Sequence, residues 1–277
     1  MKRFLLTLLT VAIVAALAVY ALAPAIIRQY RLREDGKTAA GYRAAVNGLD
    51  PSDCDVLLAQ AWDYNQARGS VPWSDPYGSG AEEGDDYAAL LNPAGNGVMG
   101  ILSLPKLGVA LAVYHGGEAE ASAGRVEHAP GSRLPADGAD GPCVLRARRE
   151  RFFDPLAHLD RLMVGDCFFL RVLQDTATYQ VFQVATMPPQ ALAGLESIDG
   201  DECALVAETA AGDRLVVRGR RVPRRSATPV DDSIPLPDGV PQLIYAAPVA
   251  AAGLAMLAIV EFIRRAIRRL RRRRMKL

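Results

Sequence analysis

The chain has 277 residues, of which 50% are hydrophobic and 23% charged, a composition that fits one globular core with a few additional apolar segments. Its net charge of +1 hides an asymmetry. Lys2, Arg3 and nine basic residues after Glu261 leave 21 basic residues against 30 acids between the two ends, a net charge of −9. An acidic middle argues against a phosphate-binding surface, so we expect no nucleic-acid partner.

Two apolar segments are long enough to cross a membrane. Residues 4–27 contain 24 positions without a charge, and residues 239–260 contain 22. A helix that spans a hydrocarbon layer of about 30 Å needs about 20 residues. The sequence therefore predicts two transmembrane helices, at 1–27 and 239–262.

The basic residues predict how these helices are oriented. Lys2 and Arg3 precede the first segment, and the tail at 263–277 is rich in arginine. Basic residues stay on the cytoplasmic side and are attracted to anionic lipids. We expect both termini in the cytoplasm and the middle of the chain outside the plasma membrane.

The first segment has an alternative interpretation as a cleaved signal peptide. Ala21-Leu22-Ala23 fits the small-residue cleavage pattern. The apolar stretch is longer than usual for a signal peptide, and Pro24 would follow the cut. These two observations favour a retained helix that acts as an anchor.

Between the membrane segments, the chain begins with a helical arm and a loop. Apolar residues have helical spacing over 28–67, interrupted at Asn47-Gly48-Leu49-Asp50-Pro51, which predicts two helices. Residues 68–95 follow and begin with a stretch rich in Gly, Pro, Ser and acids, which predicts a surface loop. This loop contains the tripeptide Asp75-Pro76-Tyr77.

Residues 96–225 have the alternating apolar pattern of β-strands. One clear pair is 168–173 and 178–184, which predicts a hairpin connected by 174–177. The last pair is the apolar run 203–207 and the β-branched run 215–217, separated by small residues. A linker at 226–238 then leads to the second apolar segment.

Several of these segments resemble the sortase family, and most closely its class C, pilin-polymerising members. Gly100 to Leu107 resembles the family's G-x-[IL]-x-[IL]-P-K-[IL] segment. Residues 205–209 and 214–219 resemble the two strands that end a sortase domain, and Asp75-Pro76-Tyr77 resembles the class C lid. The resemblance implies a mainly β fold: a closed sortase-type β-barrel with short helices, preceded by the helical arm and flanked by the transmembrane helices.

The resemblance also implies which residues form the site. Arg214 matches the arginine that stabilises the oxyanion in the family. Glu208 occupies the position of the nucleophilic cysteine, and Arg148 that of the catalytic histidine. His115 and His128 match neither role, and we expect neither a metal nor a cofactor.

The family's mechanism needs a thiol nucleophile, an acid and a group that stabilises the oxyanion. At the matching positions, this sequence lacks the first two. A carboxylate is a weak nucleophile toward an amide, and a guanidinium does not give up a proton near neutral pH. Cys203 lies five residues before Glu208, so it faces the opposite side of the same strand. We hypothesise instead that Glu208 lies between Arg148 and Arg214, with Asp75 as a second acid, in a structural ion-pair network.

The sequence is compatible with three functions. The favoured one is a catalytically inactive pseudo-sortase of the cell surface that binds pilin or cell-wall sorting signals, or a partner sortase. The alternative is an active class C sortase, a transpeptidase that cleaves an LPxTG-like motif and polymerises pilins or anchors surface proteins. A third is a membrane-anchored barrel without a ligand.

The chain has four cysteines, Cys54, Cys143, Cys167 and Cys203, without the spacing of a zinc site. The last three lie in or beside apolar runs and are most simply interpreted as small buried residues. A location outside the cell permits a disulfide, but the sequence gives no pairing.

Overall fold

The computed structural model describes residues 2–78, 84, 86–117, 124–136, 141–147, 154–156, 158–198 and 201–223. Arg148, the linker, the segment at 239–262 and the basic tail lie outside these ranges. Among the helices within them, none has the length and hydropathy of a membrane span. The compact unit that contains the barrel begins at Arg28.

Two helices precede the barrel, as the sequence predicts. Helix α1 covers Lys2–Asn47 and helix α2 covers Pro51–Arg68, with Pro51 at a position where a missing backbone N–H costs nothing. Tyr42 of α1 is fully buried, and its hydroxyl donates to the carbonyl of Met99 at 2.9 Å and accepts from the amide of Leu173 at 2.8 Å. The end of α1 is therefore attached to the barrel by a buried phenol.

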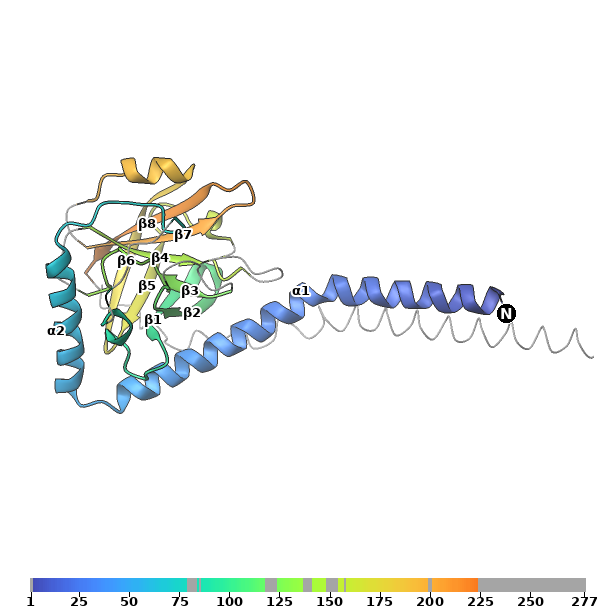
Figure 1. Cartoon of the computed structure of the whole chain (residues 1–277), viewed down its shortest axis with the longest axis horizontal. Coiled ribbons are helices and arrows are strands. Elements are labelled where there is room, and N and C mark those ends of the chain that lie inside the picture. The colour runs from blue at the N-terminus through green and yellow to red at the C-terminus, as the bar shows by residue number, and fades with distance from the viewer. Residues whose placement is uncertain are drawn as a thin grey trace, which may run out of the picture. The chain divides into compact units, whose positions relative to one another are not determined.

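Eight strands form a closed barrel in the order β1-β2-β3-β4-β7-β8-β6-β5, and β1 also pairs with β5 (Figure 1). Their bounds are β1 Val98–Leu104, β2 Val109–Tyr114, β3 Val126–His128, β4 Pro142–Ala147, β5 Cys167–Val172, β6 Asp175–Met187, β7 Glu202–Glu208 and β8 Arg214–Val222. The β2–β3 and β4–β7 pairs are parallel, and the other pairs are antiparallel. The expected closed, mainly β barrel is confirmed.

A short 3-10 helix at Tyr87–Ala89 (η1) precedes β1, and three others lie between strands at Pro105–Leu107 (η2), Leu159–Arg161 (η3) and Pro189–Gly194 (η4). The predicted hairpin has a different connection from the expected one. The β5–β6 turn consists of Leu173 and Gln174 alone, and β6 begins at Asp175. Leu173 takes a positive φ of 50°, which closes the turn in fewer residues than the polar stretch suggests.

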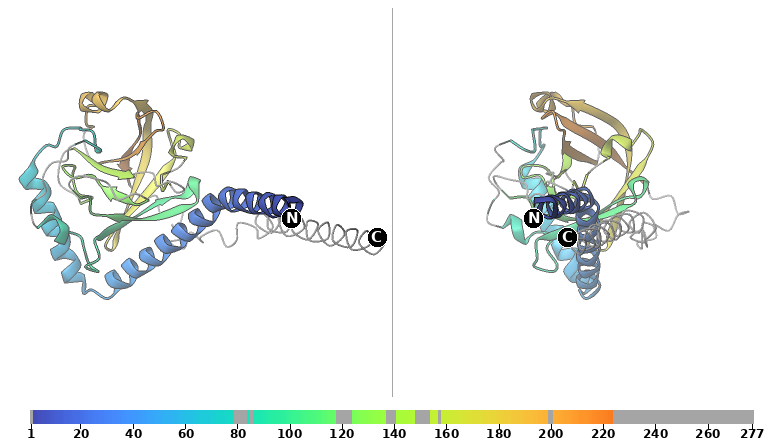
Figure 2. Two further views of the ribbon diagram at one scale, coloured as in Figure 1. Left: turned by 45° about the vertical axis from the view of Figure 1, so that its right-hand side comes forward. Right: turned by 90° about the vertical axis from the view of Figure 1, so that its right-hand side faces the viewer.

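Strands β4 and β7 are buried on both faces, which explains the continuous apolar runs at 142–145 and 203–207. Cys203, Leu205 and Ala207 of β7 point into the main core of the barrel. Ala204 and Val206 belong to a second apolar cluster on the outer face, together with Trp73. A part of the chain outside the barrel therefore covers this face. It is the segment that follows α2, which crosses to the face and contains Trp73 (Figures 1 and 2).

Candidate functional site

The outer face of β4, β7 and β8 forms an apolar floor. It consists of Val144, Ala204, Val206 and Val216, and Leu192 of η4 packs beside them. Residues 73–77, which we name the lid segment, lie on this floor through the buried indole of Trp73 and the half-buried ring of Tyr77. The chain thus covers a face of its own barrel with a short segment that carries two aromatic rings.

Tyr77 fixes the lid segment to the ends of two parallel strands. Its hydroxyl lies 2.6 Å from the carbonyl of Ala147 in β4 and 2.9 Å from the carbonyl of Val206 in β7, and it accepts from the amide of Ala147 at 3.2 Å. Burial raises the pKa of this phenol, so it stays protonated and donates. Its position depends on the paired register of β4 and β7.

Arg214, the first residue of β8, binds the lid carboxylate at two points. Its Nε lies 2.8 Å from Oδ1 of Asp75 and its Nη2 lies 3.0 Å from Oδ2. The guanidinium also lies over the Tyr77 ring, 4.6 Å from the ring centroid. Hydrogen bonding to Asp75 raises the pKa of Arg214, which keeps it charged. The expected proximity of Asp75 to Arg214 is therefore present.

Glu208 ends β7 directly opposite Arg214 in the antiparallel β7–β8 pair. Its Oε1 accepts from Nη1 of Arg214 at 3.0 Å, and the same Nη1 donates to the carbonyl of Gly212 at 3.0 Å. With the two bonds to Asp75, four of the five guanidinium N–H groups are used. An incoming oxyanion would therefore compete with two carboxylates for this arginine.

Two further arginines hold the lid segment, and the sequence analysis missed both. Arg146 of β4 donates to the carbonyl of Pro76 and, through Nη2, to the carbonyl of Gly117 at 3.1 Å. Arg218 of β8 lies over the Trp73 ring, 5.1 Å from its centroid. The alternation of side chains along a strand could have identified them. Arg218 is four residues from Arg214 and Arg146 is two residues from Arg148, and such even spacings predict that the two residues of each pair share a strand face.

Arg218 is itself held in place by a buried carboxylate. Its Nε and Nη2 donate to the two carboxylate oxygens of Glu202 at 2.5 and 3.0 Å, and its Nη1 donates to Gln183 at 2.8 Å. Both charged side chains are almost fully buried, so each depends on the other for compensation. Trp73 of the lid segment therefore packs against a guanidinium whose position is fixed by Glu202 and Gln183.

Comparisons with known proteins agree with this architecture. A profile of the sortase domain matches residues 102–222. Sortase C1 of Streptococcus agalactiae is 30% identical to this chain, and the match covers 68% of this chain and 100% of that one with a TM-score of 0.58. The chain belongs to the sortase family. Sortase C-1 of Streptococcus pneumoniae is 27% identical, with 68% of this chain and 100% of that one covered and a TM-score of 0.60. No curated protein matches.

The structures that this sortase resembles are class C sortases, as the sequence predicts. The correspondence of Glu208 to the family's cysteine and of Arg148 to its histidine stays a prediction from the sequence pattern. Arg148 lies outside the described residues, and the part of the hypothesised network within them joins Glu208 and Asp75 to Arg214.

All four thiols of this sortase lie away from Glu208. Cys143 and Cys203 are fully buried in the barrel interior, Cys54 is buried on α2, and Cys167 begins β5. Since Cys203 points inward, it does not share the face of Glu208. None of the four cysteines therefore lies on the strand face that carries Glu208.

His128 has a structural environment. It is fully buried, its Nδ1 accepts from the Tyr87 hydroxyl at 2.8 Å, and its Nε2 lies 2.9 Å from the carbonyl of Arg133 and 3.0 Å from Oγ of Ser132. Burial lowers its pKa to about 3, so the ring is neutral and donates from Nε2. The Ser132 hydroxyl donates to the carbonyl of Ala129, so this pair is not poised as a nucleophile and its base.

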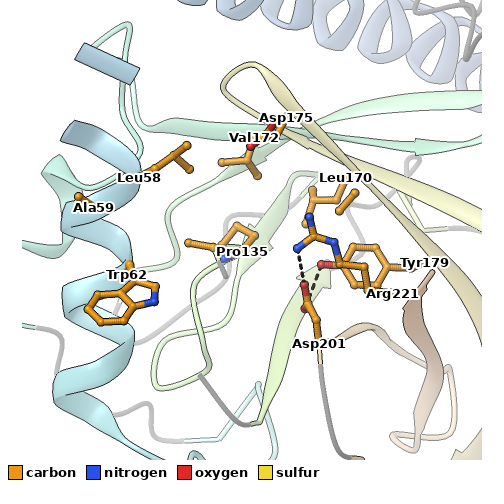
Figure 3. A pocket seen from close by; sticks show the side chains of 12 residues that line it. Leu58, Ala59, Trp62, Pro135, Leu170, Val172, Asp175, Tyr179, Asp201 and Arg221 are labelled. Atoms are coloured by element: carbon orange, nitrogen blue, oxygen red, sulfur yellow. Dashed lines mark hydrogen bonds and ion pairs between the residues drawn. The ribbon is translucent and has the colours of Figure 1, made fainter. Parts of the chain in front are cut away.

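A cavity of about 230 Å³ lies in another part of the barrel, between α2 and the β5–β6 hairpin (Figure 3). Trp62 and Leu58 of α2 line one side, and Asp201 accepts hydrogen bonds there from Arg221 at 3.0 Å and from Tyr179 at 3.2 Å. None of the residues that the sequence assigned to the site lines this cavity. The candidate site is therefore the face under the lid segment.

Proposed function

We propose that this chain is a catalytically inactive sortase of the cell surface, which binds pilin or cell-wall sorting signals or a partner sortase. The observation that carries the proposal is the ion-pair cluster at the end of β7. Arg214 is bound by Glu208 and Asp75, and all four cysteines of the chain lie elsewhere. The family's acyl transfer needs a thiolate where the chain carries a carboxylate.

The location is proposed from the sequence. The charge-free segments 4–27 and 239–260 and the basic tail favour a protein of the plasma membrane with both termini in the cytoplasm. The sortase domain would then lie outside the cell, where sorting signals are presented. No cofactor or metal is required by this function.

A cleavage assay tests the absence of activity. The outer domain, residues 28–236, is incubated with a fluorogenic peptide that contains Leu-Pro-x-Thr-Gly. We expect no cleavage by the unmodified domain or by Glu208→Cys alone, which adds a thiol without a histidine. Activity in Glu208→Cys/Arg148→His, combined with Asp75→Ala to free Arg214, would show that only the catalytic groups are missing.

Cleavage by the unmodified domain would overturn the proposal and favour the active class C transpeptidase. A second measurement addresses binding, with fluorescence anisotropy of a labelled, non-cleavable sorting peptide and of a scrambled control. We expect saturable binding of the sorting peptide, tighter in Asp75→Ala than in the unmodified domain. Absence of binding to both, together with no binding of a partner sortase, would favour a barrel without a ligand.

A further inference from the structure

Two cysteines meet in the interior of the barrel. Cys143 of β4 and Cys203 of β7 are directly opposite each other in the register of the parallel β4–β7 pair. Both side chains are 0% exposed, and burial together with the neighbouring Cys143 raises the pKa of the Cys203 thiol. Two of the four cysteines in a chain of 277 residues thus occupy one pair of facing positions.

The geometry of this pair suits a covalent bond. Neighbouring strands lie about 4.7–4.9 Å apart, and the Cα atoms of a disulfide lie about 4.4–6.8 Å apart. Residues in register on adjacent strands project to the same face, here the barrel interior. We propose that Cys143 and Cys203, which are thiols in this structure, form an intramolecular disulfide that joins β4 to β7.

The bond forms by thiol–disulfide exchange with an external disulfide, either a small-molecule disulfide or a disulfide-bearing oxidoreductase. The thiolate of one cysteine attacks a sulfur of the oxidant and expels the first oxidant thiolate. The second cysteine then attacks the mixed disulfide and expels the second. Two cysteine thiols are oxidised, one oxidant disulfide is reduced to two thiols, and the two protons end on those thiols.

The bond is structural and forms before the barrel is complete. Burial raises the pKa of the Cys203 thiol well above its usual value, so the folded barrel contains little reactive thiolate. Neither sulfur is accessible to an oxidant once β4 and β7 are covered on both faces. Exchange therefore takes place while the two strands are docking.

The bond would fix the register on which the candidate site depends. Parallel pairing is slightly weaker per residue than antiparallel pairing, and β4 and β7 are far apart in the sequence. A slip of one residue in β7 would turn Glu208 toward the interior and remove the floor residues Ala204 and Val206 from the lid segment. The Cys143–Cys203 bond prevents this slip without occupying the outer face.

The other two cysteines provide an internal contrast. Cys167 begins β5 opposite Gln180 of β6, and Cys54 lies on α2. Neither has a cysteine at the facing position, so both remain thiols. This inference is independent of the proposed function, because it requires only that the chain folds in the presence of a disulfide oxidant.

The test is a thiol count on the full-length chain, exported to an oxidising compartment or folded with glutathione disulfide, and purified in mild detergent without reductant. The protein is denatured, alkylated with N-ethylmaleimide and digested. We expect alkylation at Cys54 and Cys167 only, and a linked pair of peptides that contain Cys143 and Cys203. After reduction, all four cysteines should be alkylated.

Alkylation of all four cysteines before reduction would overturn the proposal, and so would a linked pair that involves Cys54 or Cys167. Cys54→Ala/Cys167→Ala is the matched control and should retain the linked peptides, whereas Cys143→Ala/Cys203→Ala should lose them. The unmodified chain decides the question even if the second variant fails to fold. Its reduced form should melt about 5–15 °C below its oxidised form, and equal melting temperatures would contradict a structural role.

Discussion

Arg214 of β8 and Asp75 of the lid segment form a two-point ion pair, with Nε 2.8 Å from Oδ1 and Nη2 3.0 Å from Oδ2. The pair joins the edge of the candidate site to the segment that covers it. Because Tyr77 stacks on the same guanidinium and binds the ends of β4 and β7, opening the lid segment requires all these contacts to break. We therefore expect the lid segment to stay closed unless a ligand competes for these contacts.

Replacement of Asp75 by Asn should loosen the lid segment. The change removes a charged two-point bond from a largely buried arginine, at a cost of about 1–3 kcal/mol. The chain contains two tryptophans, and Trp73 is 3% exposed whereas Trp62 is 45% exposed. In a Trp62→Phe background, the Trp73 emission should therefore shift to longer wavelength in Asp75→Asn. The exposed Asp160→Asn is the control, and an unchanged spectrum in both would contradict the anchoring role of Asp75.

Replacement of Glu208 by Ala should lower thermal stability slightly. The side chain is 39% exposed, so solvent screens its ion pair with Arg214, and the loss should be about 1 kcal/mol or less. For a domain of this size, that corresponds to a fall of about 1–4 °C in Tm, measured by calorimetry. Since Glu208 and Asp75 share Arg214, the double variant should show a non-additive loss. An unchanged Tm together with strict additivity would argue against an ion-pair network.

Replacement of Gly219 by Ala should destabilise the barrel. Gly219 of β8 lies against the Phe168 ring, and an added Cβ would lie 2.5 Å from a ring atom of Phe168 and 2.9 Å from the Tyr179 Cβ. Overpacking of this kind costs roughly 1–3 kcal/mol. Gly194→Ala is the control, because its Cβ would meet no atom within 4 Å. Chemical denaturation of the two variants should separate them, and equal stability would show that the rings move aside.

Stability should depend on pH through His128. The pKa of this ring is lowered to about 3 by burial, so below the usual value of 6.5 the unfolded chain binds a proton that the folded chain does not. Its contribution to stability is complete above pH 6.5 and falls by about 1 kcal/mol per pH unit toward pH 3. His128→Gln should remove this dependence from the free energy of unfolding, measured with urea from pH 4 to 7.

A half-buried carboxyl, Asp35, opposes this effect and determines how the experiment is interpreted. Burial raises the pKa of Asp35 to about 6, so its contribution to stability falls as the pH rises from about 4 to 6. The free energy of unfolding is therefore measured against pH for both the unmodified chain and His128→Gln. Both proteins contain Asp35, so its contribution cancels in the difference between the two slopes. Identical slopes would contradict the neutral, buried assignment of His128.

Local patterns in the sequence predicted the elements of the barrel and its family. The apolar run 203–207, the β-branched run 215–217 and the small residues between them correctly indicated β7 and β8, because strands that are buried on both faces have continuous apolar sequences. The β5–β6 turn was placed wrongly because the polar residues Asp175 and Thr176 belong to the first residues of β6. Polarity alone does not distinguish a turn from the end of a strand.

Within the site, the sequence by itself determined Asp75, Pro76, Tyr77, Glu208 and Arg214 as the residues to consider, because these positions carry a recognisable local pattern. Only the tertiary structure decided what they contact. The two-point bond of Arg214 to Asp75, the support from Arg146 and Arg218, and the meeting of Cys143 with Cys203 all join segments far apart in the chain. Such contacts depend on the closure and register of the barrel, and no local periodicity encodes them.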